Sequence, residues 1–177
     1  MNFDGTTKEK EDKRPKLKII TLSGTESVTK NMTVYEYGDD IILVDCGVGF
    51  PDADQYGINV VIPDFSYVLQ NSHRVKGLFI TYGHEDHIGA VPYLLRELDV
   101  PVYASKIVQG FINERLNDRS NKDLQGKVKF HLFTPESEEV RLGAFRVSAF
   151  GVNHSVPSSS GLAINTPEGL VLHISDF

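Results

Sequence analysis

Four consecutive residues bring together side chains that could do chemistry. His84, Glu85, Asp86 and His87 place two imidazoles and two carboxylates within four positions. Nitrogen and oxygen donors of this kind suit zinc, with manganese or magnesium favoured where carboxylates dominate, and a catalytic site leaves one coordination position open for water. The alternative is a chance cluster on the surface. The elements on either side of the cluster favour a metal site.

An apolar run before the cluster and helical spacing after it indicate how the cluster is positioned. Residues 75–81 are predicted to form a buried strand. Apolar residues then recur at helical spacing from Ile88 to Leu98, where Pro92 is compatible only with the first helical turn. The cluster therefore lies where a strand passes into a helix, and we expect Gly83 to permit the tight entry into the loop.

The rest of the chain reads as short strands with two further helices. We expect strands over residues 17–22, 33–37 and 41–46, with a hairpin turn at 38–40. Asp64 is predicted to cap a short helix that ends at Gln70, and Ser105 a longer helix with an apolar face from Ile107 to Leu116. Later strands are expected over residues 102–104, 127–133, 145–152, 161–165 and 170–175. This order predicts a mixed α/β fold.

Length and composition fit one globular domain, since 40% of the 177 residues are hydrophobic and 24% are charged. Residues 1–16 are expected to be a flexible charged tail, with an RNA-contacting arm as the alternative. No apolar run approaches the ~20 residues of a membrane span. The single cysteine, Cys46, lies in an apolar run and is expected to be buried, which favours the cytoplasm.

The net charge and the end of the chain suggest that these residues do not act alone. Because phosphate contacts by Lys and Arg dominate nucleic-acid affinity, a net charge of −6 predicts weak RNA binding by this segment. The chain stops at Phe177, directly after an apolar strand, without a closing helix. We therefore expect a fragment of a longer protein.

The segment from Thr81 to Ala90 resembles the signature loop of metallo-β-lactamase-fold enzymes, His-x-His-x-Asp-His. Residues 30–37 and 61–67 are similar to the ribonuclease J family of β-CASP ribonucleases in particular, and the similarity extends from about Leu17 to Phe177. The resemblance implies that residues 17–177 form the N-terminal part of a metallo-β-lactamase-like αββα sandwich. The sandwich would be incomplete, with the β-CASP and C-terminal regions absent.

The resemblance also implies a set of site residues. It assigns metal binding to His84, Asp86, His87, His154 and Asp176. In this assignment His84 and His154 hold a first ion, Asp86 and His87 hold a second, and Asp176 bridges both. Asp86 also takes part in proton transfer.

Ordinary explanations exist for the more distant of these residues. His154 could be a loop histidine and Asp176 an exposed terminal residue. Asp45, which matches an aspartate that orients the metal loop without being a ligand, could be a strand-end turn. The remaining histidines are expected to be structural: His73, His131 and His173.

The activity implied is hydrolysis of RNA phosphodiester bonds, as an exo- or endoribonuclease of RNA maturation and decay. Two ions, zinc or else manganese or magnesium, would share a hydroxide that attacks phosphorus. The resemblance leaves open a homo-oligomer and partners in RNA degradation.

Two departures from the family pattern favour other functions. Tyr82 stands where the pattern has its first histidine, and the family's last histidine would lie beyond Phe177, so each ion is one protein ligand short. We therefore expect weak or no activity from these residues alone. The alternatives are a metal-poor pseudoenzyme or binding fragment, and a small-substrate hydrolase of the same fold, such as a thioester hydrolase.

Overall fold

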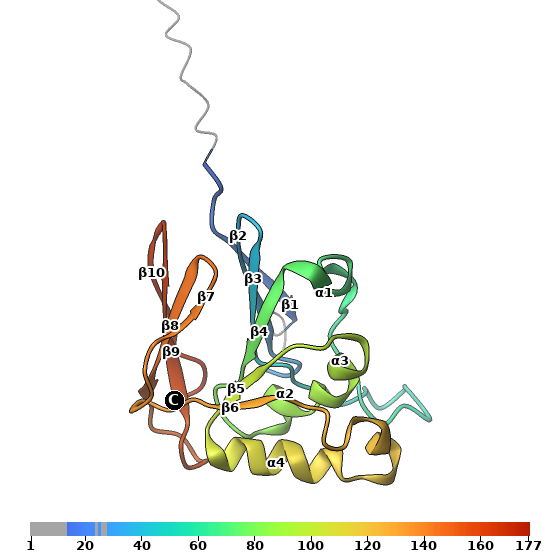
Figure 1. Cartoon of the computed structure of the whole chain (residues 1–177). Helices are drawn as coiled ribbons and strands as arrows, with labels where there is room; N and C mark the ends of the chain where they lie inside the picture. Colours follow the sequence, from blue (N-terminus) through green and yellow to red (C-terminus); the bar gives the residue numbers. More distant parts are fainter. Residues whose placement is uncertain (1–13, 24, 26–27) are drawn as a thin grey trace, which may run out of the picture.

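Two β-sheets pack face to face in the computed structural model, and helices cover the outer face of the larger sheet (Figure 1). The structure describes residues 14–177 except 24, 26 and 27. Residues 1–13 of the expected tail lie outside the described residues. In the described part of the chain, no helix is long and apolar enough to cross a membrane.

The larger sheet has six strands in the order β1-β2-β3-β4-β5-β6. Its first three strands are antiparallel, and β3 to β6 are parallel. The strands are β1 (Lys18–Ser23), β2 (Met32–Tyr37), β3 (Asp40–Val44), β4 (Val75–Phe79), β5 (Val102–Ala104) and β6 (Phe130–Leu132). Because β3 and β4 are parallel neighbours, the loops that follow them meet at one edge of the sheet.

The helices lie in the connections between the strands of this sheet. They are α1 (Ser66–Gln70), the 3-10 helix η1 (Ser72–Arg74), α2 (Glu85–Ile88), α3 (Val91–Glu97), α4 (Lys106–Leu116) and the 3-10 helix η2 (Arg119–Leu124). Ser105 caps α4 as predicted, since its hydroxyl accepts a hydrogen bond from the Val108 amide at 3.4 Å. Asp64 accepts a bond from the Ser66 amide at 2.8 Å, although the cap position before α1 belongs to Phe65.

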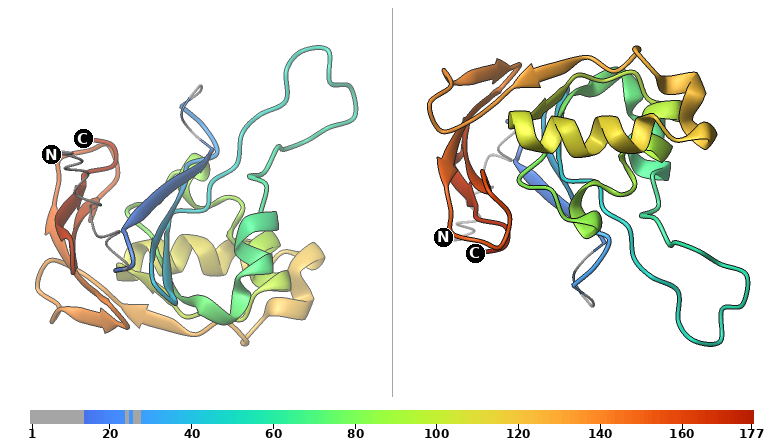
Figure 2. Two further views of the ribbon diagram at one scale, coloured as in Figure 1. Left: turned by 90° about the horizontal axis from the view of Figure 1, so that it is seen from above. Right: turned by 90° about the horizontal axis from the view of Figure 1, so that it is seen from below.

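The smaller sheet is antiparallel throughout, in the order β10-β9-β8-β7. Its strands are β7 (Val140–Leu142), β8 (Phe145–Gly151), β9 (Ser160–Thr166) and β10 (Gly169–His173). Figure 2 shows this sheet on the side of the larger sheet opposite the helices. The same views show the connection that follows Gly49 reaching out from the body of the molecule.

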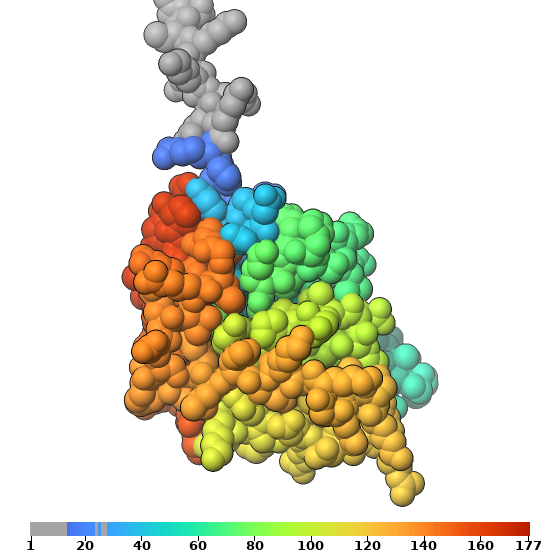
Figure 3. Space-filling view, viewed as in Figure 1, coloured from blue at the N-terminus to red at the C-terminus, as the bar shows by residue number. Residues whose placement is uncertain are grey.

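Alternating residues of the larger sheet face two separate cores. Ile41, Leu43 and Leu78 are buried against the helices, whereas Ile42 and Phe79 are buried against the smaller sheet. This alternation follows from the period of two in a strand, because both faces of the sheet are covered. The space-filling view shows the smaller sheet lying directly against the larger one (Figure 3).

The structure corrects several expected boundaries. The helix expected from Ile88 to Leu98 is two helices, α2 and α3, and Pro92 lies in the first turn of α3 as required. The short strand β7 was not predicted, and the strand expected over 127–133 is only Phe130–Leu132. Among the described residues, helices cover only the larger sheet. One helical layer and the two sheets therefore make three of the four layers of an αββα sandwich.

Candidate metal centre

The histidine cluster lies in the loop after β4 and in the single turn of α2. His84 occupies the cap position of α2, and its carbonyl accepts bonds from the amides of His87 and Ile88, both at 3.0 Å. The turn is also held by the segment after β3, since the Cys46 amide donates to the His87 carbonyl at 2.8 Å and the Val48 amide to the Glu85 carbonyl at 3.0 Å. Backbone bonds therefore fix the loop against the sheet edge.

Gly83 is required in this loop for a different reason from the one expected. Its backbone is not in the left-handed region, so the absence of a side chain is not needed for its conformation. A Cβ atom at this position would instead lie 2.5 Å from the ring of Phe111 on α4. The missing side chain lets α4 pack against the loop.

His87 and Asp45 form the most buried part of the site. His87 is 2% exposed and Asp45 is 1% exposed, and His87 Nδ1 lies 2.8 Å from Asp45 Oδ2. Asp45 also accepts bonds from the Thr81 amide and hydroxyl, each at 2.8 Å in its shorter contact. Because a carboxylate can only accept, the proton of the neutral imidazole lies on Nδ1. Nε2 therefore carries the lone pair, which faces Asn31 Nδ2 at 3.0 Å and is the atom that could bind a cation.

Negative charge around His87 favours its protonated form. Burial by itself lowers the pKa of His87, but the charges of Asp45, Asp86 and Asp176 outweigh it and the pKa is raised. The same charges attract a cation, which replaces the extra proton when it binds.

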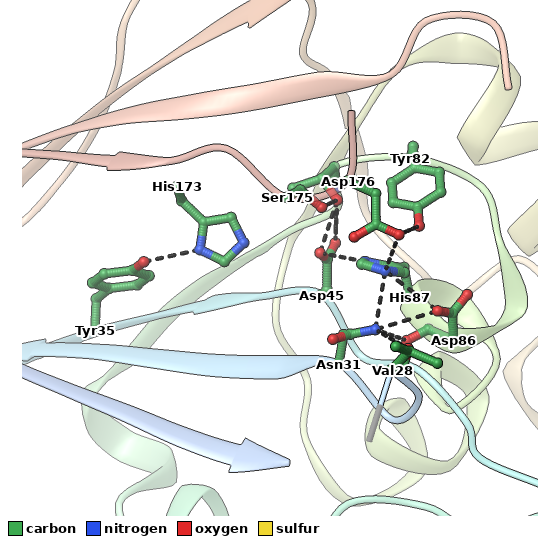
Figure 4. Close-up of polar contacts among 11 residues, drawn as sticks. Val28, Asn31, Tyr35, Asp45, Tyr82, Asp86, His87, His173, Ser175 and Asp176 are labelled. Atoms are coloured by element: carbon green, nitrogen blue, oxygen red, sulfur yellow. Dashed lines mark hydrogen bonds and ion pairs between the residues drawn. The ribbon is translucent and has the colours of Figure 1, made fainter. Parts of the chain in front are cut away.

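Asp86, His87 and Asp176 meet although they come from the loop after β4 and from the end of the smaller sheet (Figure 4). One ligand atom from each lies within 4.8 Å of the others. His87 Nε2 is 3.6 Å from Asp86 Oδ2 and 3.9 Å from Asp176 Oδ2. Two carboxylate oxygens and one imidazole nitrogen in this arrangement fit a divalent cation.

Two further residues support this cluster and were not identified from the sequence. Asn31 Nδ2 lies 3.0 Å from His87 Nε2 and 3.3 Å from Asp86 Oδ2. Ser175, in the left-handed conformation with φ of 63°, contacts the Thr81 hydroxyl at 2.9 Å and lets the chain after β10 approach the loop. Asn31 lies more than 50 residues from the cluster in sequence, so spacing carries no signal for it.

Tyr82 occupies the centre of the other half of the site. Its ring is 1% exposed and its centroid lies 4.9 Å from that of His84, 4.3 Å from that of His87 and 4.8 Å from that of His154. Its hydroxyl donates a hydrogen bond to Asp176 Oδ2 at 2.6 Å. Burial, followed by this bond and the nearby carboxylates, raises the pKa of Tyr82, so the phenol is neutral.

His84 and His154 lie beside each other, with ring centroids 5.2 Å apart. His84 Nε2 contacts the Ser155 hydroxyl at 3.2 Å. His154 Nε2 is buried and has no hydrogen-bond partner among the described residues. The five residues assigned to metal binding are therefore brought into one region, but only three of them share a common centre.

The other histidines do not belong to the group of donors formed by Asp86, His87 and Asp176. His173 Nδ1 contacts the Tyr35 hydroxyl at 2.9 Å, and His131 stacks on Tyr103 with centroids 4.9 Å apart. His73 is exposed in η1. A hollow of about 320 Å³ between the sheets is lined by His173 together with residues of the centre, and it provides an open approach to Asp176.

Residues 28–177 match the metallo-beta-lactamase superfamily, and the chain belongs to this superfamily. Within it, the chain is 41% identical to ribonuclease J of Mycoplasma genitalium over 161 residues, which is 90% of this chain and 28% of that protein. It is 38% identical to ribonuclease J 2 of Staphylococcus aureus strain MRSA252 over 165 residues, 93% of this chain and 29% of that protein. The resemblance to ribonuclease J is thus confirmed, and the chain spans less than a third of these relatives.

Solved structures confirm the fold. The metallo-beta-lactamase fold protein YhfI from Bacillus subtilis aligns with a TM-score of 0.58 and 16% sequence identity, covering 89% of this chain and 61% of that one.

Proposed function

We propose that this chain is the N-terminal part of a metal-dependent ribonuclease that hydrolyses RNA phosphodiester bonds. The observation that carries the proposal is the meeting of Asp86, His87 and Asp176 from distant parts of the chain, with donor atoms within 4.8 Å of one another. Similarity to ribonuclease J over most of the chain supports RNA as the substrate. The chain covers less than a third of those relatives, which supports the proposal that residues 17–177 are part of a longer catalytic region.

Each residue of the centre has a role that follows from its contacts. His87, oriented by Asp45, would present Nε2 to the cation, and Asp86 and Asp176 would supply oxygen ligands. A bound zinc, manganese or magnesium ion would supply a Lewis acid for the phosphoryl oxygens and lower the pKa of water. Asp86, which is partly exposed, would accept a proton from the attacking water.

Other parts of the proposal rest on the similarity alone. The similarity alone implies a two-ion mechanism, in which His84 and His154 would hold a first ion and Asp176 would serve both; the group of Asp86, His87 and Asp176 requires only one ion. The exo- or endonuclease type, a cytoplasmic location, self-association and partners in RNA degradation are likewise predictions for the complete protein.

Metal content and RNA hydrolysis test the proposal together. The complete protein, purified with zinc or manganese, should contain bound metal and degrade single-stranded RNA, and His87→Ala should lose both. His131→Ala is the matched control, because this exposed imidazole stacks on Tyr103 away from the centre. Metal-free wild-type protein without ribonuclease activity would instead identify a pseudoenzyme or binding module.

An assay with a thioester substrate tests the remaining alternative, a small-substrate hydrolase of the same fold. Hydrolysis of a thioester without hydrolysis of RNA would identify a small-substrate hydrolase of the same fold and would contradict the proposal.

A further inference from the structure

The two halves of the site differ in how many donors they offer. Among the described residues, Asp86, His87 and Asp176 form the one group of three His, Cys, Asp or Glu ligands with atoms within 4.8 Å. The other half offers the imidazoles of His84 and His154, whose centroids are 5.2 Å apart. A catalytic zinc site in a protein usually has three protein ligands, so this second half lacks one.

Tyr82 stands where the missing donor would be needed. Its ring lies between the rings of His84, His87 and His154, with centroid distances of 4.3 to 4.9 Å. Its hydroxyl donates to Asp176 Oδ2 at 2.6 Å, so the carboxylate that could complete the second half already has a hydrogen-bond partner. A phenol whose hydroxyl already donates to a carboxylate is a poor metal ligand, and its ring fills the space beside the imidazoles of His84 and His154.

We infer that Tyr82 makes this metal centre mononuclear. One divalent ion binds to Asp86, His87 and Asp176, while the ring and hydroxyl of Tyr82 keep the half formed by His84 and His154 free of metal. The inference rests on the proposed metal-dependent function and specifies its metal stoichiometry.

The hydroxyl of Tyr82 also positions Asp176. Asp176 lies after β10 and is exposed, and its described side-chain contacts are with Tyr82 and His87. With Oδ2 held by the phenol, the carboxylate is turned toward the ion on His87. Tyr82 is therefore a positioning residue for the single ion as well as an obstacle to a second.

The number of Zn²⁺ ions bound per chain tests this inference without an activity assay. It is measured by calorimetric titration with zinc and by metal analysis of the dialysed protein. Wild type should bind one Zn²⁺ per chain. Tyr82→Phe should also bind one, because it keeps the ring and adds no donor, whereas Tyr82→His should bind two. Tyr93→His is the matched control, since Tyr93 is 40% exposed on α3 and a histidine there adds an imidazole outside the centre.

The outcomes separate this inference from the proposed function. Two ions on wild type or on Tyr82→Phe would overturn the inference, as would one ion on a Tyr82→His protein with a wild-type circular dichroism spectrum. If Tyr82→His does not fold, the wild-type and Tyr82→Phe stoichiometries decide. One ion without RNA hydrolysis by the complete protein would support the inference and contradict the ribonuclease proposal. Two ions with RNA hydrolysis would contradict the inference and support the ribonuclease proposal.

Discussion

At the scale of the residue, the centre depends on how Asp45 holds His87. Asp45 is buried, adopts a left-handed conformation with φ of 60°, and receives three donors: the amide and hydroxyl of Thr81 and the Nδ1 proton of His87. These bonds set both the tautomer and the orientation of the imidazole. Partners of this kind contribute to metal affinity without touching the metal.

Asp45→Asn should therefore weaken zinc binding by about 10- to 100-fold, because one of its two side-chain atoms becomes a donor facing other donors. Calorimetric titration measures the change in Kd. Asp123→Asn, at an exposed carboxylate that pairs with Arg96, is the control and should leave Kd unaltered. Equal affinities for Asp45→Asn and wild type would show that Asp45 has no orienting role.

At the scale of the element, α4 and the metal loop approach so closely that a side chain at Gly83 would force the Phe111 ring to move. A Cβ atom there would lie 2.5 Å from the Phe111 ring, whereas one at Gly110, in the same helix, would meet no atom within 4 Å. The two glycines thus offer the same substitution in opposite surroundings.

Gly83→Ala should lower the free energy of unfolding by about 1–3 kcal/mol through overpacking. Gly110→Ala should raise it by about 0.5–1 kcal/mol, since alanine has the higher helix propensity. Urea denaturation followed by circular dichroism measures both changes. Destabilisation of similar size in the two variants would contradict the packing argument.

A second inter-element contact centres on Glu36 of β2. Its carboxylate binds Lys18 of β1 at 2.8 Å and Arg74 of η1 at 2.9 Å, and it accepts a short hydrogen bond from Tyr67 of α1. Although burial opposes it, these partners lower the pKa of Glu36 to about 2. One side chain therefore ties together the edge strand and two helices.

Because the folded pKa is below the unfolded value, the stabilisation is complete above about pH 4.5 and is lost as the pH falls toward 2. After allowance for the exposed Lys18, we expect about 2 kcal/mol from this group. Glu36→Gln should lower stability at pH 7 and flatten its decline between pH 4.5 and 2, measured by denaturation at each pH. A decline as steep as that of wild type would assign the acid sensitivity to other groups.

At the scale of the whole molecule, the centre exists only because two sheets pack together. Asp86 and His87 follow β4 of the larger sheet, whereas His154 lies between β8 and β9 of the smaller sheet and Asp176 follows β10. Phe79, Phe145 and Leu162 are fully buried between the sheets. Loss of this packing should separate the two groups of donors.

Leu162→Ala should cost about 2–5 kcal/mol of stability, because it leaves a cavity in a fully buried position. Zinc affinity should fall as well, since Asp176 is held by the same sheet. Leu172→Ala on β10 is the control: Leu172 is 55% exposed, and its loss should cost less than about 1 kcal/mol. Unchanged zinc affinity in a folded Leu162→Ala protein would show that sheet packing does not position Asp176.

The sequence by itself determined most of the elements and the place of the metal loop. Periodicity identified β2, β3, β4 and α4, because these elements are long enough or apolar enough for the pattern to show. The sequence also showed the density of donors from His84 to His87 and the position of Tyr82 in the motif. Short edge elements such as β7 were missed, since three residues carry too little pattern.

Only the tertiary structure decided which of the distant residues meet. No spacing relates Asn31 or Asp176 to His87, because their separation is set by how the two sheets pack and not by the chain between them. The structure also replaced a conformational reason for Gly83 with a steric one, the ring of Phe111. Above all, it placed the Tyr82 hydroxyl on Asp176, a contact across 94 residues that arises because buried polar groups must find partners wherever the fold brings them.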